Sequence, residues 1–131
     1  MMELTSTYIL LQGLQYHAFI GVGEQEQVVG NDYVLDLRLG YPFAAAMKSD
    51  AVDDTLNYAD VFNVVSEVMK QPSKLLEAAA GKIVKELCAR YKRLESIEKI
   101  DIDIAKINPP MGADCDCAGV ELHLINDKTK D

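Results

Sequence analysis

The chain has 131 residues, of which 49% are hydrophobic, and a net charge of −8 at pH 7. This length predicts one globular domain, residues 1–131, with a small core. The acidic charge disfavours nucleic acids and anionic membranes as partners, because binding to either requires clustered Lys and Arg. A small neutral ligand or another protein is the expected partner.

The sequence also bears on the compartment in which the protein works. No apolar run reaches the roughly 18 residues of a membrane span, and Met1–Thr5 lacks the features of a signal peptide. The three cysteines are an odd number in a chain that can build a core without disulfides, so we expect free thiols. Together these observations predict a cytoplasmic protein.

The first third of the sequence predicts a long β-hairpin. Residues Tyr8–Val22 are apolar and aromatic apart from an interruption at Gly13, which is typical of a strand. Apolar and polar residues alternate over Asp32–Tyr41 and predict the second strand. The glycine-flanked, polar segment between them predicts a connecting loop that contains Glu26.

Two helices are predicted next. Apolar residues over Tyr58–Lys70 have the spacing of one helical stripe, and a second stripe extends over Leu75–Tyr91. Ser73 is expected to cap the second helix. Lys92 and Arg93 are expected at its C-terminal end, where the helix dipole favours cations.

Two more strands complete the chain. Alternating apolar residues return over Ile100–Lys106 and again over Val120–Leu124, with a turn at Asn108–Pro110 between them. Residues Asn126–Asp131 resemble a charged, frayed tail. The order ββααββ predicts an α+β fold, in which a four-stranded antiparallel sheet carries two helices on one face.

Such a sheet leaves two edges unpaired, and its second face here carries partly apolar residues. Pairing of edges between copies would cover both. We therefore expect a homo-oligomer in which the sheets close into a β-barrel.

Four residues that could act in one site lie beside predicted element ends or Gly and Pro residues: Glu26, Tyr58, Glu77 and Lys106. They supply two acceptors, a phenol and an amine, which suit proton transfer on a nitrogen heterocycle without a metal. Taken singly, each has an ordinary explanation that equals or outweighs the functional one. These explanations are a solvated loop carboxylate, amphipathic packing, an acid in a helix's first turn and an amine reaching solvent, respectively.

Other chemical signals in the sequence are weak. Cys115 and Cys117 lack a second Cys or His pair at zinc spacing, so no metal site is predicted. His17 and His123 lie in predicted strands without a Ser or Cys nucleophile beside an obvious base. No phosphate-binding loop or dinucleotide motif occurs, so no cofactor is predicted.

Short segments along nearly the whole chain follow a specific order and spacing: Leu11–Leu14, Ile20–Val22 with Glu26-Gln27 and Gly30, Asp54–Val61, Leu75–Glu77, and Lys106 with Asn108–Pro110. In these segments the chain resembles the dihydroneopterin aldolases, folate-pathway enzymes of the tunnelling-fold superfamily. The resemblance implies a lyase that cleaves 7,8-dihydroneopterin by a retro-aldol reaction. The products would be 6-hydroxymethyl-7,8-dihydropterin and glycolaldehyde, and epimerisation at the 2′ carbon is a possible side reaction.

The resemblance also implies roles for individual residues. Glu77 would bind the 2-amino group and N3–H of the pterin, helped by the backbone near Leu76, with Leu56 as a third substrate-binding residue. The catalytic residues would be Lys106, Glu26 and Tyr58.

The resemblance further implies an assembly and a mechanism. The family forms homo-tetramers or homo-octamers with active sites between subunits, and Tyr58 would reach the site of a neighbouring subunit. The conjugated C=N of the substrate accepts the electrons of the broken bond, so neither a metal nor a Schiff base is needed.

Two alternatives stay open at this point. One is a dihydroneopterin triphosphate 2′-epimerase of the same superfamily, which would need basic residues at the pocket mouth. The other is a non-catalytic oligomer that binds pterins or purines; such a protein would need Glu77 but would have no use for both Lys106 and Tyr58.

Overall fold

The computed structural model describes residues 1–91 and 97–127 of the chain. Its elements, in chain order, are β1 (Tyr8–Ala18), α1 (Glu24–Val29), β2 (Asn31–Gly40), α2 (Ala44–Ser49), a 3-10 turn η1 (Val52–Asp54), α3 (Tyr58–Met69), α4 (Leu76–Arg90), β3 (Lys99–Lys106) and β4 (Ala118–Ile125). The predicted order of four strands and two long helices is confirmed. The short elements α1, α2 and η1 are additional to the prediction.

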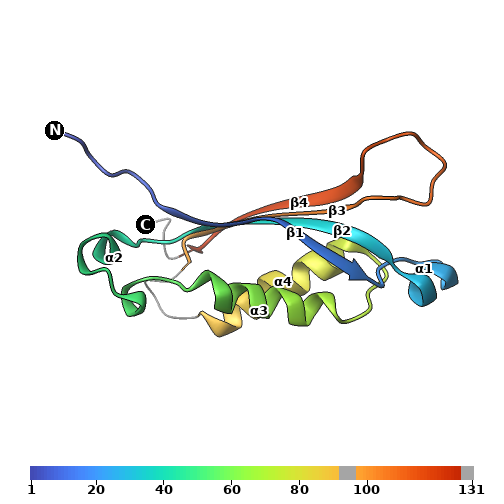
Figure 1. The fold of residues 1–131 in the computed structure, drawn as a ribbon, viewed down its shortest axis with the longest axis horizontal. Coiled ribbons are helices and arrows are strands. Elements are labelled where there is room, and N and C mark those ends of the chain that lie inside the picture. Colours follow the sequence, from blue (N-terminus) through green and yellow to red (C-terminus); the bar gives the residue numbers. More distant parts are fainter. Residues whose placement is uncertain (92–96, 128–131) are drawn as a thin grey trace.

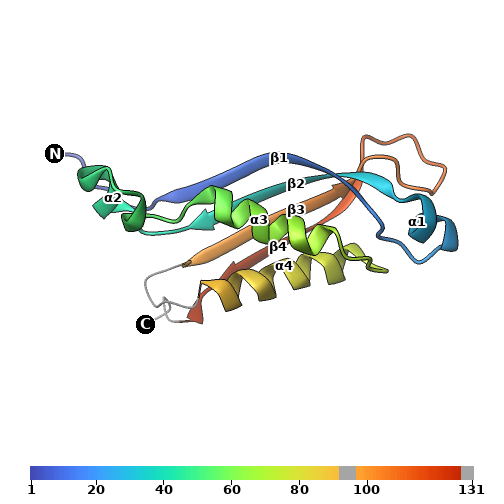
Figure 2. The ribbon, with the colours of Figure 1, turned by 60° about the horizontal axis from the view of Figure 1, so that its bottom comes forward.

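The four strands form an antiparallel meander in the order β1-β2-β3-β4, and α3 and α4 cover one face of it (Figures 1 and 2). Alternation places every second residue of each strand on the helix side. Leu35, Leu37 and Leu39 of β2 lie there opposite Ile104, Ile102 and Ile100 of β3, and all six are at most 4% exposed. Burying one such side chain stabilises the fold by about 1.5–3 kcal/mol, so this double row forms the centre of the core.

Strand β1 is shorter than predicted and contains a β-bulge. Its register against β2 shifts between Leu11 and Leu14, where Gly13 has φ +69° and its N–H donates to the Asp36 carboxylate at 2.6 Å. The strand ends at Ala18 instead of Val22, because the chain then leaves β2.

The segment that leaves β2 pairs with the residues before α4. Ile20 forms an isolated parallel bridge with Ser73, whose N–H donates to Phe19 and whose carbonyl accepts from Gly21. Ser73 is therefore not the helix cap. Its backbone is held in sheet-like hydrogen bonds, and α4 starts later, with Leu75 at the N-cap position and no side-chain capping bond.

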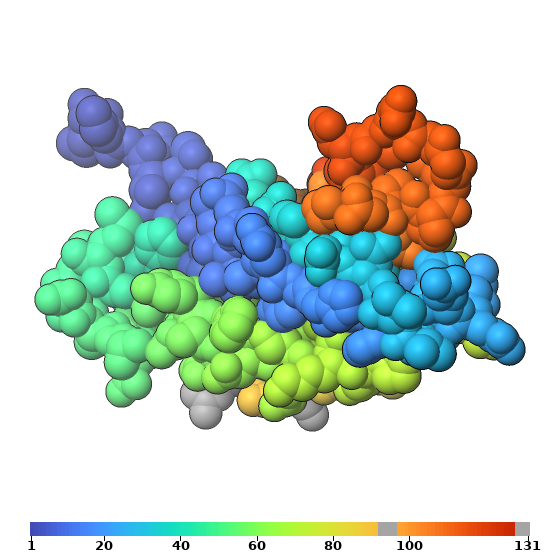
Figure 3. Space-filling model, turned by 45° about the vertical axis from the view of Figure 1, so that its right-hand side comes forward, coloured from blue at the N-terminus to red at the C-terminus, as the bar shows by residue number. Residues whose placement is uncertain are grey.

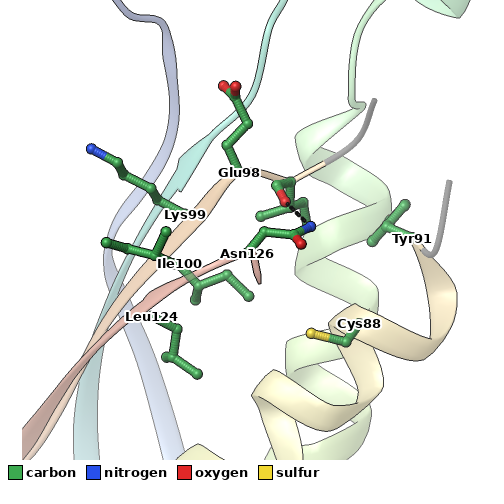
Figure 4. Close-up of a pocket in the computed structure, with 9 residues that line it drawn as sticks. Cys88, Tyr91, Glu98, Lys99, Ile100, Leu124 and Asn126 are labelled. Atoms are coloured by element: carbon green, nitrogen blue, oxygen red, sulfur yellow. Dashed lines mark hydrogen bonds between the residues drawn. The ribbon is translucent and has the colours of Figure 1, made fainter. Parts of the chain in front are cut away.

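A pocket of about 330 Å³ lies between the C-terminal end of α4, the start of β3 and the end of β4 (Figure 4). Asn126 lines it, and its side-chain nitrogen donates to the Ile97 carbonyl at 3.0 Å while its N–H donates to Glu98 at 2.9 Å. The predicted fraying is therefore wrong for Asn126. The predicted C-terminal cations Lys92 and Arg93, and the tail from residue 128 onward, lie outside the described residues.

Of the helices within residues 1–91 and 97–127, none is both long enough and apolar enough to cross a membrane.

Candidate functional site

Lys106, the last residue of β3, forms an ion pair with Glu26. Its Nζ lies 2.6 Å from Oε2 of Glu26 and also donates to the carbonyl of Ile20 at 3.1 Å. The two side chains are 11% and 22% exposed, respectively. The amine does not reach out to solvent along the sheet, so the ordinary explanation for Lys106 is wrong. Two residues 80 positions apart form one acid–base pair.

Glu26 reaches Lys106 because the connection between β1 and β2 contains a short helix. The sequence predicted a loop there, but residues Glu24–Val29 form α1, with Gly23 at the N-cap. Glu26 stands in the first turn, where the helix dipole favours a carboxylate. Its Oε1 accepts from the Gly23 N–H at 3.4 Å, while Oε2 accepts from Lys106.

Both members of the pair are charged at neutral pH. The hydrogen bond from Lys106 lowers the pKa of Glu26 below its usual value. Burial pulls the pKa of Lys106 down, but the hydrogen bond to Glu26 and the attraction of Tyr33 and Glu26 outweigh it, so the pKa is raised. The site thus holds an ammonium donor and a carboxylate acceptor side by side.

A cluster of hydrogen bonds around Gly21 and Ser73, called here the Ser73 cluster, fixes α1 to its surroundings. The side-chain amide of Gln27 donates to the carbonyl of Gly21 at 2.6 Å and to that of Ser73 at 2.9 Å. Lys82 donates to the Ser73 hydroxyl at 2.8 Å from α4. The end of β1, α1 and the start of α4 are therefore held together, at the end of the sheet where β3 finishes.

Replacing Gly21 with Ala is expected to separate the ion pair. A Cβ at Gly21 would lie 2.1 Å from Oε2 and 2.6 Å from Cβ of Glu26, so the whole residue would have to move. Because Glu26 is one of the residues expected to act in catalysis, we expect activity to fall about 10²-fold, the loss typical of a displaced catalytic group. Gly81→Ala is the matched control, since a Cβ there meets no atom within 4 Å and the change favours helix α4. Equal activity of the two variants would contradict the assigned packing.

The pH dependence of stability should report the same pair. Because the pKa of Glu26 is lowered in the folded state, its contribution is present above the unfolded pKa of about 4.3 and is lost as the pH falls through the folded value. The raised pKa of Lys106 means that its contribution is present below about 10.4 and is lost as the pH rises through the folded value. Glu26→Gln is therefore expected to lower the melting temperature most between these limits.

Urea or thermal unfolding of both proteins at pH 3, 7 and 11 measures this difference. Glu24→Gln, an exposed carboxylate on the same helix, serves as the control. A constant difference in melting temperature across the pH range would mean that the ion pair does not stabilise the fold.

Glu77 and Leu76 lie at the start of α4, beside the Ser73 cluster. Glu77 is exposed and Leu76 is partly buried against the core. In Figure 2 this end of α4 points toward α1, and in Figure 3 the α1 segment and the loop after β3 lie at the same end of the molecule. Glu26, Lys106 and the α4 residues therefore share one end of the chain's fold.

Tyr58 and Leu56 lie at the other end. Tyr58 is 63% exposed and, with Leu56, lines a groove of about 540 Å³ against Tyr8 at the start of β1. Tyr8 pairs with Gly40, which pairs with Lys99. Strands rise about 3.3 Å per residue, so the two ends of β3 are on the order of 20 Å apart. Within one chain, Tyr58 does not join Lys106 and Glu26.

The three cysteines of the chain are free thiols. Cys115 and Cys117 are exposed, as is Cys88. In the described part of the chain, no group of His, Cys, Asp or Glu side chains is arranged to hold a metal ion.

The described geometry can be compared with known proteins. A family model described as dihydroneopterin aldolase matches residues 9–123. The chain belongs to the dihydroneopterin aldolase family. A dihydroneopterin aldolase from Staphylococcus epidermidis is 32% identical over 120 residues, which cover 91% of this chain and 97% of the relative.

Solved structures of dihydroneopterin aldolases share the fold. The FolB protein of Vibrio cholerae is 27% identical with a TM-score of 0.83, and the match covers 94% of this chain and 100% of that one. An Escherichia coli dihydroneopterin aldolase in complex with neopterin is 26% identical with a TM-score of 0.80, over 90% and 98% of the two chains. The α+β architecture inferred from the strand and helix pattern is thus that of the family.

Sequence reasoning missed several groups around the pair, namely Tyr33, Gln27 and the carbonyl of Ile20. Tyr33 fits the alternating pattern of a core strand, and nothing in that pattern marks its hydroxyl as different from a packed ring. Gln27 directly follows Glu26, but its contacts with Gly21 and Ser73 depend on the unpredicted helix α1.

Proposed function

We propose that this chain cleaves 7,8-dihydroneopterin by a retro-aldol reaction, giving 6-hydroxymethyl-7,8-dihydropterin and glycolaldehyde in folate biosynthesis. The observation that carries this proposal is the charged pair of Lys106 and Glu26 in a chain of the dihydroneopterin aldolase family. The structural match to an Escherichia coli enzyme in complex with neopterin supports a pterin ligand.

The reaction requires mainly proton transfer from the protein. When the carbon–carbon bond of the side chain breaks, its electrons move into the conjugated C=N of the substrate. The protein must take up the proton of the 2′-hydroxyl and protonate the ring nitrogen as the enamine forms. It must then protonate the enamine carbon while the ring nitrogen gives its proton back and the C=N re-forms, which is general acid–base catalysis. Lys106 as an ammonium donor and Glu26 as a carboxylate acceptor suit these steps, with water as carrier. Tyr58 is proposed as the third proton carrier.

Glu77 is proposed to recognise the substrate. A carboxylate can accept two parallel N–H bonds from the amino-pyrimidinone edge of a pterin, in the same way that it accepts two from a guanidinium group. Its exposure at the start of α4 leaves it available to a ligand. The Leu76 backbone and Leu56 are proposed to border the ring.

A complete site requires a second subunit. The chain carries its two groups of candidate residues at opposite ends of the sheet, and among residues 1–91 and 97–127 no further strand pairs with the outer edges of β1 and β4. Apolar side chains are exposed at both ends, with Val22 and Leu75 near α1 and α4 and Phe62 on α3. We propose that edges pair between copies to form a barrel-shaped tetramer or octamer, in which Tyr58 and Leu56 of one copy complete the site of another.

The free thiols fit a reducing compartment, so we propose the cytoplasm as the place of the reaction.

Incubation of the purified protein with 7,8-dihydroneopterin tests the proposed function. We expect glycolaldehyde and 6-hydroxymethyl-7,8-dihydropterin in equal amounts. Absence of glycolaldehyde at high enzyme concentration, with binding of neopterin retained, would mean a non-catalytic pterin binder. Turnover of dihydroneopterin triphosphate in preference to the free substrate would instead mean a 2′-epimerase.

A further inference from the structure

The carbonyl oxygen of Ile20 accepts hydrogen bonds from two side chains. The hydroxyl of Tyr33 donates to it at 2.7 Å, and Nζ of Lys106 donates to it at 3.1 Å. A carbonyl oxygen has two lone pairs, so these two donors together satisfy it. Ile20 and Tyr33 are each only 1% exposed, which places this shared acceptor behind the ion pair, in the core.

Tyr33 and Lys106 are also direct cross-strand neighbours. They are paired across β2 and β3, so their side chains leave the same face of the sheet. The ammonium lies 5.7 Å from the centroid of the Tyr33 ring. Among the described residues, Tyr33 on β2 and Glu26 on α1 are the titratable groups that act on the charge of Lys106.

We propose that Tyr33 is a positioning residue for the reaction: its hydroxyl holds the Ile20 carbonyl in the orientation that keeps the Lys106 ammonium beside Glu26. This inference rests on the proposed function, because Lys106 is the group that it positions. The peptide that carries the Ile20 carbonyl lies beyond the end of β1, so the β1–β2 ladder does not hold it, and on its other side the Gly21 N–H donates to the Ser73 carbonyl at 3.0 Å. The Tyr33 hydroxyl restrains the carbonyl side of this peptide.

The hydroxyl also influences the proton on Lys106. Tyr33 raises the pKa of Lys106, because the partial negative charge of its hydroxyl oxygen favours the nearby ammonium. Burial raises the pKa of Tyr33 itself, so the phenol stays protonated and continues to donate to Ile20. Loss of the hydroxyl should therefore make Lys106 less tightly held and easier to deprotonate.

Tyr33→Phe tests the proposal, because it removes the hydroxyl and keeps the ring in the core. We expect kcat to fall about tenfold with little change in KM, as for a catalytic group that has moved slightly. The basic limb of the kcat profile, where Lys106 loses its proton, should move to lower pH. In the free protein, the pH midpoint for acetylation of Lys106 by acetic anhydride, followed by mass spectrometry, should move in the same direction.

Tyr16→Phe is the matched control. Tyr16 stands opposite Tyr33 on β1 and is half-buried, and its hydroxyl is hydrogen-bonded to the Ser66 hydroxyl at 2.9 Å. The same deletion there should lower the melting temperature without moving either pH midpoint. The control thus separates loss of a buried hydroxyl in general from loss of the one that faces Lys106.

Unchanged pH midpoints in Tyr33→Phe, or equal shifts in Tyr33→Phe and Tyr16→Phe, would overturn the proposal. The acetylation measurement does not need turnover. If the native protein released no glycolaldehyde, the proposed function would fail, while the labelling midpoints would still decide whether Tyr33 controls Lys106.

Discussion

Replacing Lys106 with Met is expected to lower kcat by about 10²- to 10⁴-fold, the usual contribution of a general acid or base. Met keeps the apolar stem that packs at the end of β3 but removes the ammonium that contacts Glu26 and Ile20. Because the pterin ring is proposed to be held by Glu77, the Kd for neopterin should change much less than kcat. Steady-state kinetics and calorimetric titration with neopterin measure the two effects separately.

The opposite pattern is expected for Glu77→Gln. Losing the carboxylate removes the acceptor for two N–H groups, so affinity should fall about 10- to 100-fold, as for a hydrogen-bonded charge. At saturating substrate, kcat should be affected less. Glu86→Gln, also an exposed carboxylate on α4, is the control. If Lys106→Met and Glu77→Gln weakened neopterin binding equally and left turnover per bound substrate unchanged, the division between catalysis and recognition would be wrong.

The sheet and the two long helices could be predicted because their signal is local. In β2 and β3, every second residue is apolar, and the structure places those residues on the buried face. The stripes of α3 and α4 match their buried faces at Val61, Val65, Ile83 and Leu87, whereas three further apolar positions of the stripes, Phe62, Leu75 and Cys88, are exposed. Such periodic patterns specify an element without reference to any other part of the chain.

The short elements could not be predicted because they depend on partners distant in the sequence. Helix α1 has only six residues and none of them is buried, so no apolar stripe marks it. The hydrogen bonds from the Gln27 side chain to the carbonyls of Gly21 and Ser73 hold this helix in place. The prediction for Ser73 fails in the opposite way: its local sequence predicts a helix cap, but its backbone pairs with Ile20 instead.

The candidate site was predictable in its residue types but not in its geometry. Glu26 and Lys106 stand near glycine and proline residues in the sequence, and the family resemblance implies that they act together. Their contact spans 80 residues of sequence and depends on both α1 and the β2–β3 register, which no local pattern encodes. The Tyr33 hydroxyl was missed because a core tyrosine and a positioning tyrosine have the same sequence signature.

If the active site is shared between subunits, combining two inactive variants is expected to restore activity. Lys106→Met removes the ammonium at one end of the chain, and Tyr58→Phe removes the phenol at the other, on the order of 20 Å away. If each site takes Lys106 from one copy and Tyr58 from another, random reassembly of equal amounts restores both native residues in roughly a quarter of the sites. Mixing should therefore yield activity well above that of either variant alone.

The experiment requires that subunits exchange, so both variants are unfolded in urea, mixed and refolded, and hetero-oligomers are verified by native mass spectrometry. Refolding Lys106→Met together with the double variant Lys106→Met/Tyr58→Phe is the control, because no chain in that mixture carries the ammonium. That mixture should stay inactive. Hetero-oligomers without recovered activity would mean that Tyr58 does not act across a subunit boundary, and the separation of Tyr58 from Lys106 within one chain would then leave it no part in the reaction.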